Sequence, residues 1–291
     1  MASISIVIPV YNEEKAVKNT VERAKKVAAK LKQHKVEVLI VNDGSKDKTA
    51  QILNKIGGIK VINRPYNCGY GASLKVGLRE AMGDWIVITD ADGTYPIEDI
   101  PRLVKLVPEY DMVVGARVGK TVHIPFFRRP AKWVVGKLAN MMVKRKIEDI
   151  NSGLRIFNKK KALEFMKLYP PGFSFTTTIT LAFFTNDYTV KYIPINYFKR
   201  KGSSIMGDVP SPKAIKTFFN FIGIIFRIIL YFRPLKFFAW PGSLLILAGI
   251  IYGYYQTVTS VAGLGDLPVL LLILGTLVIF LGVIADSIAK K

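Results

Sequence analysis

Residues 85–93 read WIVITDADG, and this stretch decides the fold. A strand-like apolar run at 85–89 leads directly into two carboxylates, Asp90 and Asp92, and a glycine. The same order, an apolar run and then a polar cluster, occurs at residues 3–13 (SISIVIPVYNE) and 36–45 (VEVLIVNDGS). Short apolar runs bounded by turn residues are typical of buried strands. Each of these segments is therefore predicted to be a strand followed by a polar loop.

Helix-like segments separate the predicted strands. The predicted helices are 14–33, 47–55, 71–81 and 97–106, and the further predicted strands are 59–63 and 112–114. Strands that alternate with helices form βαβ units, in which a parallel sheet is covered on both faces. Ligands bind such sheets beyond the carboxyl ends of the strands. The polar clusters at 9–13, 42–45 and 90–93 are therefore expected to line one cleft.

The composition excludes several classes of protein. The formal net charge is +21, yet 50% of the residues are hydrophobic, so the chain is not disordered. A single cysteine excludes an internal disulfide. Cys68, His34 and His123 are too few and too scattered for a zinc site. The strongly basic balance fits an anionic substrate or anionic lipid. Nucleic acid is not expected as a partner, because no helix-turn-helix, RNA-binding signature or zinc finger is visible.

Two long apolar runs lie near the C-terminal end of the sequence. Residues 237–255 and 267–285 contain no charged side chain, and each is long enough as a helix to cross a hydrocarbon core of about 30 Å. We expect a transmembrane hairpin, the alternative being a buried helical pair in a soluble protein. The link at 256–266 has no Lys or Arg, whereas basic residues flank both outer ends. The positive-inside rule then places both termini and the preceding domain in the cytosol.

The segment before the hairpin differs from the two runs. Its apolar part, 218–232, is short and contains Asn220 and Arg227, which favours a helix lying in the membrane interface over a third span. The expected organisation is an α/β catalytic domain at 1–210, a juxtamembrane amphipathic helix at 211–235 and a hairpin at 236–291.

The polar loops carry residues suited to bind a nucleotide and a metal ion. Asp90 and Asp92 are two residues apart in a loop and can hold a hard divalent cation such as Mg²⁺ or Mn²⁺. A solvated turn is the alternative. Asp43 can accept hydrogen bonds from a base or ribose, or it can form an Asx turn or helix cap. Tyr11 can stack on a base, and Glu13 can bond to the nucleoside.

These motifs together resemble a known family. Family 2 glycosyltransferases with the GT-A fold have the same motifs in the same order, here SIVIPVYNEE, VNDGSKDKT, NCGYGASLKVGL, GDWIVITDADGTYP, GAR and NSG. Within that family the chain is similar to the polyprenyl-phosphate sugar synthases, the group that contains dolichyl-phosphate mannose synthase. The resemblance covers about residues 3–205, and the C-terminal hairpin matches the same group.

The resemblance implies roles for matching residues on the donor side. Pro9, Tyr11, Glu13 and Asp43 would enclose the nucleoside of a nucleotide-sugar. Asp90 and Asp92 would form the metal-binding Asp-x-Asp motif, with Asp92 the more direct ligand and Asp90 closer to the ribose or in the metal shell. Mannose synthases often carry a Gln shortly after this motif, where this chain has Gly93 and Thr94. The identity of the sugar is therefore left open.

The resemblance also implies an acceptor side. Asp149 and Ser152, in DINSG, would lie near the reaction centre as catalytic residues, together with Asp90, Asp92 and Arg117. The residues implied to bind the acceptor phosphate are Arg117, Arg128, Arg129, Arg200, Lys201 and Ser203.

The implied function is that of a membrane-bound inverting glycosyltransferase. It would move a sugar from GDP-mannose or a UDP-sugar to dolichyl or polyprenyl phosphate at the cytosolic face. Two alternatives remain at this level: a transferase that acts on another membrane lipid, and a membrane adaptor without turnover. The sequence leaves open the isoprenoid, the choice of Mg²⁺ or Mn²⁺, and whether the chain forms a homo-oligomer.

Overall fold

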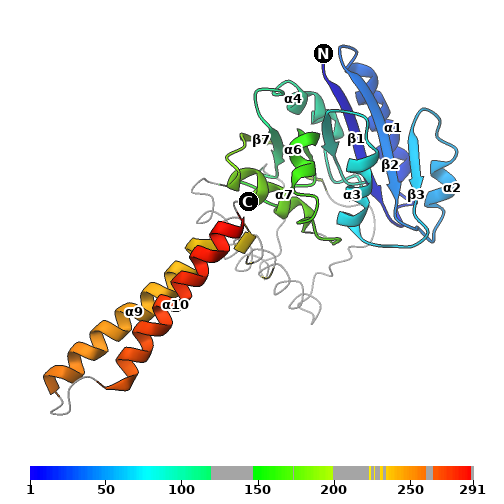
Figure 1. Cartoon of the computed structure of the whole chain (residues 1–291). Coiled ribbons are helices and arrows are strands. Elements are labelled where there is room, and N and C mark those ends of the chain that lie inside the picture. Colours follow the sequence, from blue (N-terminus) through cyan, green and yellow to red (C-terminus); the bar gives the residue numbers. More distant parts are fainter. Residues whose placement is uncertain are drawn as a thin grey trace. The chain divides into compact units, whose positions relative to one another are not determined.

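The computed structural model describes residues 1–118, 147–172, 174–198, 223, 226, 230–231, 234–259 and 265–289. The chain divides into two compact units, Met1–Ile222 and Gly223–Lys291, which are described separately below. Figure 1 shows the sheet and helices of the first unit and the helical pair of the second.

A mixed sheet forms the centre of the first unit. Within the described residues it has seven strands in the order β3-β2-β1-β4-β6-β5-β7. The strands are β1 Ser3–Val10, β2 Lys35–Asn42, β3 Lys60–Asn63, β4 Trp85–Ile88, β5 Met112–Ala116, β6 Arg155–Asn158 and β7 Val190–Pro194. All neighbouring pairs are parallel except the two that involve β6, which runs antiparallel between β4 and β5. The predicted α/β class with a mostly parallel sheet is confirmed.

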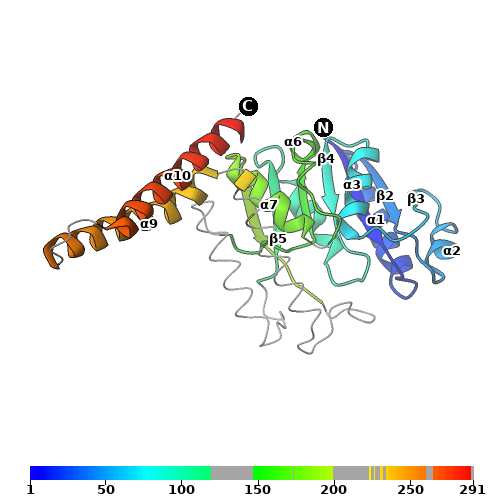
Figure 2. The same cartoon turned by 60° about the horizontal axis from the view of Figure 1, so that its bottom comes forward.

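Helices cover both faces of this sheet (Figure 2). The helices of one face are α1 Val17–Lys30, α2 Thr49–Leu53, the 3₁₀ helix η1 Ile97–Asp99 and α4 Ile100–Val104. The helices of the other face are α3 Tyr70–Glu80, α6 Lys159–Glu164 and α7 Phe175–Thr185. Every helix and strand predicted in the first 114 residues is present, with ends shifted by a few residues.

The periodicity of the first strand and helix explains their packing. Alternate residues of β1, namely Ile4, Ile6 and Ile8, are buried in one cluster with the apolar stripe of α1, which includes Val21 and Ala24. Side chains two apart on a strand share a face, and side chains three or four apart on a helix do the same. Burying each of these isoleucines contributes about 1.5–3 kcal/mol, which fixes the register of β1.

The second unit is a pair of long helices, α9 Pro234–Thr259 and α10 Asp266–Ala289 (Figure 1). The predicted spans 237–255 and 267–285 lie inside them. Both helices are long and apolar enough to cross a membrane. Their outward side chains are large and apolar, and Trp240, Ile251 and Phe280 are more than half exposed. Most of the expected juxtamembrane helix at 211–235 lies outside the described residues.

Small residues let the two helices approach closely. A β-carbon on Gly275 would lie 2.7 Å from the carbonyl oxygen of Gly242, and one on Gly242 would lie 2.8 Å from the carbonyl oxygen of Gly275. Apolar helices associate through such close backbone contact when water supplies no driving force between them. The glycine pair therefore defines where α9 and α10 pack together.

Gly275→Leu is expected to destabilise the hairpin, because the new side chain would overlap the backbone of α9. Overpacking of this kind costs about 1–3 kcal/mol. The measurement is the thermal midpoint of the full chain in detergent. Ala248→Leu is the control, since Ala248 is exposed on α9 and its new side chain would point outward. Equal midpoints for the two variants would contradict the packing described here.

Candidate active site

The strand directions bring the predicted site residues to one edge of the sheet. Because β1, β2, β4 and β5 all run the same way, their C-terminal ends lie at the same edge. Asp43 follows β2, Asp90 follows β4 and Arg117 follows β5. The antiparallel β6 begins at this edge, so the segment just before it, 149–153, lies beside the loops that follow β4 and β5.

Asp90 and Asp92 are held in a tight turn after β4. The hydroxyl of Tyr70 donates to Asp90 Oδ1 at 2.9 Å. Asp90 also packs against the backbone of Gly153, where an added β-carbon would lie 2.9 Å from Asp90 Oδ2. Asp92 is 9% exposed, and its Oδ1 accepts hydrogen bonds from the backbone N–H and hydroxyl of Thr94. Both carboxylates are therefore fixed by neighbours before any ligand binds.

The donor set suits a hard divalent cation. Carboxylate oxygens are the ligands that Mg²⁺ and Mn²⁺ prefer, and Mg²⁺ is usually bound through one or two carboxylates together with substrate phosphates. Among the described residues, no group of three or more His, Cys, Asp and Glu side chains is arranged to hold a metal. Asp90 and Asp92 could hold such a cation only if its remaining ligands came from a bound substrate or water.

Arg117, which is partly exposed, forms an ion pair with the buried carboxylate of Asp149 beside these carboxylates. The backbone N–H of Arg117 donates to Asp149 Oδ2 at 3.0 Å, its Nε donates to the same oxygen at 2.8 Å, and its Nη2 donates to Oδ1 at 2.9 Å. The guanidinium also lies over the ring of Tyr197, 5.2 Å from its centroid. Burial opposes the charge on Arg117, but the hydrogen bonds that it donates to Asp149, together with the negative charge of Asp149, outweigh this and raise the pKa of Arg117.

Asp149 and Ser152 are engaged within the protein. The side chain of Asp149 is 3% exposed and holds Arg117, which favours a positioning role. Ser152 is fully buried, and its hydroxyl donates to the carbonyl of Gly115 in β5 at 2.5 Å. Next to it, the N–H of Gly153 donates to the hydroxyl of Tyr95 at 2.7 Å. The 149–153 loop is thus tied to β5 and to the turn after β4.

A cavity of about 560 Å³ lies at the other end of the same sheet edge. It is formed by the loops after β1, β2 and β3 and is lined by Tyr11, Asn42, Gly44, Ser45, Lys46, Ala50, Asn63, Arg64, Pro65, Tyr66 and Asn67. Aromatic faces, amides and one guanidinium are groups that can stack on a base and hydrogen-bond to its edge. The cavity is large enough for a ligand and combines these groups in one place.

Three predicted nucleoside contacts lie at or near this cavity. Tyr11 lines it directly. Pro9 is buried near the end of β1. Glu13 is half-buried at the turn into α1, where its backbone N–H donates to the Thr49 hydroxyl at 2.9 Å.

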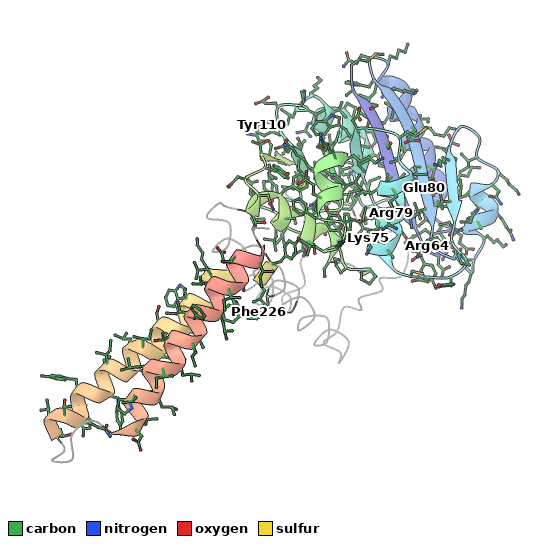
Figure 3. All side chains as sticks on the ribbon, viewed as in Figure 1. Arg64, Lys75, Arg79, Glu80, Tyr110 and Phe226 are labelled. Atoms are coloured by element: carbon green, nitrogen blue, oxygen red, sulfur yellow. The ribbon has the colours of Figure 1, made fainter. Side chains whose placement is uncertain are left out.

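Asp43 organises the wall of the cavity. It is 3% exposed, and its Oδ1 accepts a hydrogen bond at 2.8 Å from Nη1 of Arg64, the residue that follows β3 (Figure 3). Its Oδ2 accepts from the backbone N–H of Gly69 at 2.8 Å, and both oxygens accept from that of Cys68. The carboxylate therefore fixes the 64–69 segment.

The N-terminal end of α3 is bonded to a neighbouring loop. The N–H groups of Gly71 and Ala72 donate to the carbonyls of Gly172 and Pro171, at 3.2 and 2.9 Å. Lys75, labelled in Figure 3, donates to the carbonyl of Tyr169 at 3.0 Å. The backbone N–H groups of Gly71 and Ala72 are therefore used within the protein and are not available to bind a phosphate.

Several predicted acceptor residues fall outside the described part of the chain. They are Arg128, Arg129, Arg200, Lys201 and Ser203. Their roles stay predictions.

Two family profiles match this chain. The profile described as Glycosyl transferase family 2 matches residues 5–166, more than half of the chain. The chain belongs to glycosyl transferase family 2. A second profile, described as GtrB C-terminal hairpin, matches residues 233–290, the region of α9 and α10. Both matches agree with the resemblance found in the sequence.

Curated relatives include hexosyltransferases and transferases that act on undecaprenyl phosphate. The low-salt glycan biosynthesis hexosyltransferase Agl6 of Haloferax volcanii is 28% identical over 72% of this chain and 51% of its own length. The undecaprenyl-phosphate 4-deoxy-4-formamido-L-arabinose transferase of Proteus mirabilis is 32% identical over 54% of this chain and 49% of its own. The bactoprenol glucosyl transferase of Shigella phage SfX is 34% identical over 57% and 55%. The match thus spans about half the length of each of these three relatives.

A solved structure supports the fold of this family 2 chain. Glucosyl-3-phosphoglycerate synthase from Mycobacterium tuberculosis, crystallised with Mn²⁺, uridine diphosphate and phosphoglyceric acid, superimposes with a TM-score of 0.61. The identity is 16%, and the match covers 78% of each chain. At this identity the likeness concerns the fold, and it confirms the GT-A class predicted from the sequence.

Some contributors to the site were not predicted from sequence. Arg64, which holds Asp43, stands in a segment without a distinctive pattern. Tyr70, which holds Asp90, lies in the NCGYGASLKVGL motif but was assigned no role. Tyr197 lies far along the chain from the Arg117 that it contacts. One residue, Leu154, separates Arg155 from the NSG motif, and a charged residue in the sequence gives no sign that its side chain is completely buried. For these residues, the only sequence signal was the position of Tyr70 inside the NCGYGAS motif.

Asp43→Asn is expected to destabilise the first unit and weaken nucleotide binding. An amide keeps one acceptor oxygen, but its NH₂ cannot accept the hydrogen bonds made by the second carboxylate oxygen, and Arg64 would lose its anionic partner, so the cost is about 3 kcal/mol. The measurements are the thermal midpoint and nucleotide affinity by calorimetry.

Asp99→Asn is the control for this substitution. Asp99 pairs with Arg102, which is half exposed, and such surface pairs contribute about 0–1 kcal/mol. If both variants unfold at the wild-type temperature, Asp43 does not organise the cavity wall.

Proposed function

We propose that this family 2 chain transfers a sugar from a nucleotide-sugar to a polyprenyl phosphate. The observation that carries the proposal is the arrangement at the sheet edge: a carboxylate pair, a partly exposed guanidinium held by a buried carboxylate, and a cavity at neighbouring strand ends. The printed names of two relatives, an undecaprenyl-phosphate transferase and a bactoprenol glucosyl transferase, support the same acceptor class.

The donor would lie along the loops after β1, β2, β3 and β4. The cavity lined by Tyr11 and Arg64 would take the nucleoside, and the diphosphate would extend toward Asp90 and Asp92. A divalent cation, Mg²⁺ or Mn²⁺, held by these carboxylates would neutralise charge on the departing diphosphate. Tyr70, Thr94 and the Gly153 backbone keep the two carboxylates in place for this task. Either GDP-mannose or a UDP-sugar fits this description.

The acceptor phosphate would meet Arg117. Asp149 engages Nε and Nη2 of this guanidinium, and Nη1 makes no hydrogen bond to any residue that the structure describes. Nη1 can therefore donate to a phosphate oxygen while Asp149 keeps the plane of the guanidinium fixed. Arg128, Arg129, Arg200, Lys201 and Ser203 are proposed to add further contacts to the same phosphate.

Such a reaction needs no strong general base. The second pKa of a phosphate monoester is about 6, so the acceptor is mostly dianionic at neutral pH. One of its oxygens attacks the anomeric carbon while the bond from that carbon to the diphosphate breaks, which inverts the centre. Asp149, already paired with Arg117, is then required to position this arginine rather than to take a proton.

The C-terminal hairpin follows from the nature of the acceptor. An isoprenoid leaves a bilayer only at a cost of about 0.8 kcal/mol per exposed CH₂, so the enzyme must work at the membrane. We propose that α9 and α10 span the bilayer as part of the 236–291 segment, that 211–235 lies in the interface, and that the 1–210 catalytic domain and both termini are cytosolic. The bilayer is thus a partner as well as the source of the acceptor.

The proposal predicts an acid-labile lipid product. Purified chain is incubated with labelled UDP-sugars or GDP-mannose, with Mg²⁺ or Mn²⁺, and with either undecaprenyl or dolichyl phosphate in vesicles. The expected result is a labelled lipid from which mild acid releases the labelled sugar. Asp92→Asn is expected to lower its rate of formation by about 100-fold or more, because charge on the departing diphosphate is no longer neutralised. Asp99→Asn should react like the wild type.

Other products would contradict the proposal in different ways. A labelled glycerolipid formed from diacylglycerol, with none from polyprenyl phosphate, would assign a different membrane acceptor. Nucleotide binding without turnover for any donor and acceptor would indicate an adaptor.

Arg117→Lys is expected to impair use of the acceptor selectively. Lysine keeps the charge but cannot hold the planar contact with Asp149, so we expect kcat/KM for the lipid phosphate to fall about 100-fold. The KM for the nucleotide-sugar should change by less than about threefold, since the nucleoside cavity is built by other strands. The test is a steady-state comparison with Arg102→Lys, a half-exposed arginine on α4, as control. An equal rise in both KM values would argue against an acceptor role.

A further inference from the structure

Arg155, the first residue of β6, is completely buried. Arginine is almost never fully buried without an acidic partner. Within the described part of the chain, however, the salt bridges leave Arg155 out. Burial lowers the pKa of Arg155. Burying the charged guanidinium therefore destabilises the folded state unless each of its N–H donors has a hydrogen-bond acceptor.

The donors of Arg155 are satisfied by two separate parts of the fold. Its Nε and Nη2 donate to the carbonyl of Ser152, and Nη2 also donates to that of Ile150 at 3.4 Å. On the other side, Nη1 donates to the carbonyl of Thr176 at 3.0 Å and to the hydroxyl of Thr180 at 2.7 Å. Nη1 also lies 3.9 Å from the sulfur of Met112. The guanidinium therefore bridges the 149–153 loop and α7.

The 149–153 loop contacts both halves of the proposed site. Its first residue, Asp149, holds Arg117 on the acceptor side. Its last residue, Gly153, packs against Asp90 on the donor side and donates to Tyr95. A shift of this loop would therefore change the distance between the acceptor guanidinium and the donor carboxylates.

We propose that Arg155 is a positioning residue that fixes the separation of Asp90 and Arg117 by holding the 149–153 loop against α7. The inference rests on the proposed sugar transfer at that site. Only arginine has a planar fork that can satisfy carbonyls on two elements at once, whereas lysine offers one compact ammonium group. Such supporting contacts matter because a misplacement of about 1 Å can cost a rate factor of about 100.

The same helix offers a matched pair of variants for the test. Thr178 and Thr180 are both fully buried on α7, and each hydroxyl donates to a carbonyl of its own helix. Only the Thr180 hydroxyl also accepts from Arg155, and it lies 3.5 Å from the carbonyl of Ile150, so both of its contacts toward the 149–153 loop are lost in Thr180→Val. Thr180→Val should lower kcat about fivefold, the loss expected for one hydrogen bond. Its KM for the nucleotide-sugar should stay unchanged, and Thr178→Val should match the wild type in both.

Arg155→Lys is the stronger variant. We expect kcat to fall about 100-fold, as for other residues that support a reacting group, while nucleotide affinity stays within about threefold of the wild type. If Thr180→Val and Thr178→Val have equal kcat, or if Arg155→Lys raises the KM for the donor as much as it lowers kcat, the inference is wrong.

Amide hydrogen exchange separates this inference from the proposed function. Exchange at residues 149–153 should be faster in Thr180→Val and Arg155→Lys than in Thr178→Val, with exchange in β1 and β2 unchanged. A wild-type chain that transfers no sugar would refute the proposed function and leave this result standing. Equal exchange in all three variants would refute the role of Arg155, whatever the activity.

Discussion

One constraint of chain direction organises the site: β6 runs antiparallel between two strands that are parallel to each other. In a purely parallel sheet, the segment that enters a strand lies at the opposite edge from the ligand-binding loops. Because β6 is reversed, its entering segment lies beside the loops that leave β4 and β5. The 149–153 loop can therefore contact Asp90 on one side and Arg117 on the other.

In the two ion pairs at this edge, the carboxylate is more deeply buried than the arginine. Asp43 and Asp149 are each almost inaccessible, while their arginine partners, Arg64 and Arg117, are partly exposed. Burying ion pairs is costly and often adds nothing to stability, so their presence favours a role in fixing geometry. In each pair the carboxylate is the more deeply buried partner, and Arg64 also lines the cavity. That arrangement is suited to reactants that are themselves anions.

The sequence predicted the regular part of the fold well. Strand β1 lies in the segment where it was predicted, and β4 and β5 end within two residues of their predicted ends, because their apolar runs are bounded by polar turns. By contrast, β6 (RIFN) and β7 (VKYIP) were not predicted, since they are short and mix charged with apolar residues. Their place in the sheet depends on contacts with distant strands, which a local pattern does not contain.

The position of the site could be predicted from the sequence, but the hydrogen-bond partners of its residues could not. Polar residues at strand ends correctly indicated one edge of the sheet. The role of Asp43 toward a nucleoside stays a prediction, whereas its hydrogen bonds with Arg64 and two backbone N–H groups were not predicted. Which partner a buried carboxylate finds depends on loops that converge only after folding, as the distance in sequence between Arg117 and Asp149 illustrates.

The central claim is that the carboxylates after β4 and the cavity beside Tyr11 hold one nucleotide diphosphate together with a cation. Anomalous scattering from Mn²⁺, in crystals of the full chain grown with Mn²⁺ and a nucleoside diphosphate, tests it directly. The account predicts a peak at the Asp90 and Asp92 carboxylates, with diphosphate oxygens as further ligands and the base in the cavity lined by Tyr11 and Arg64. A nucleotide bound elsewhere, or a Mn²⁺ peak remote from Asp90 and Asp92, would contradict it.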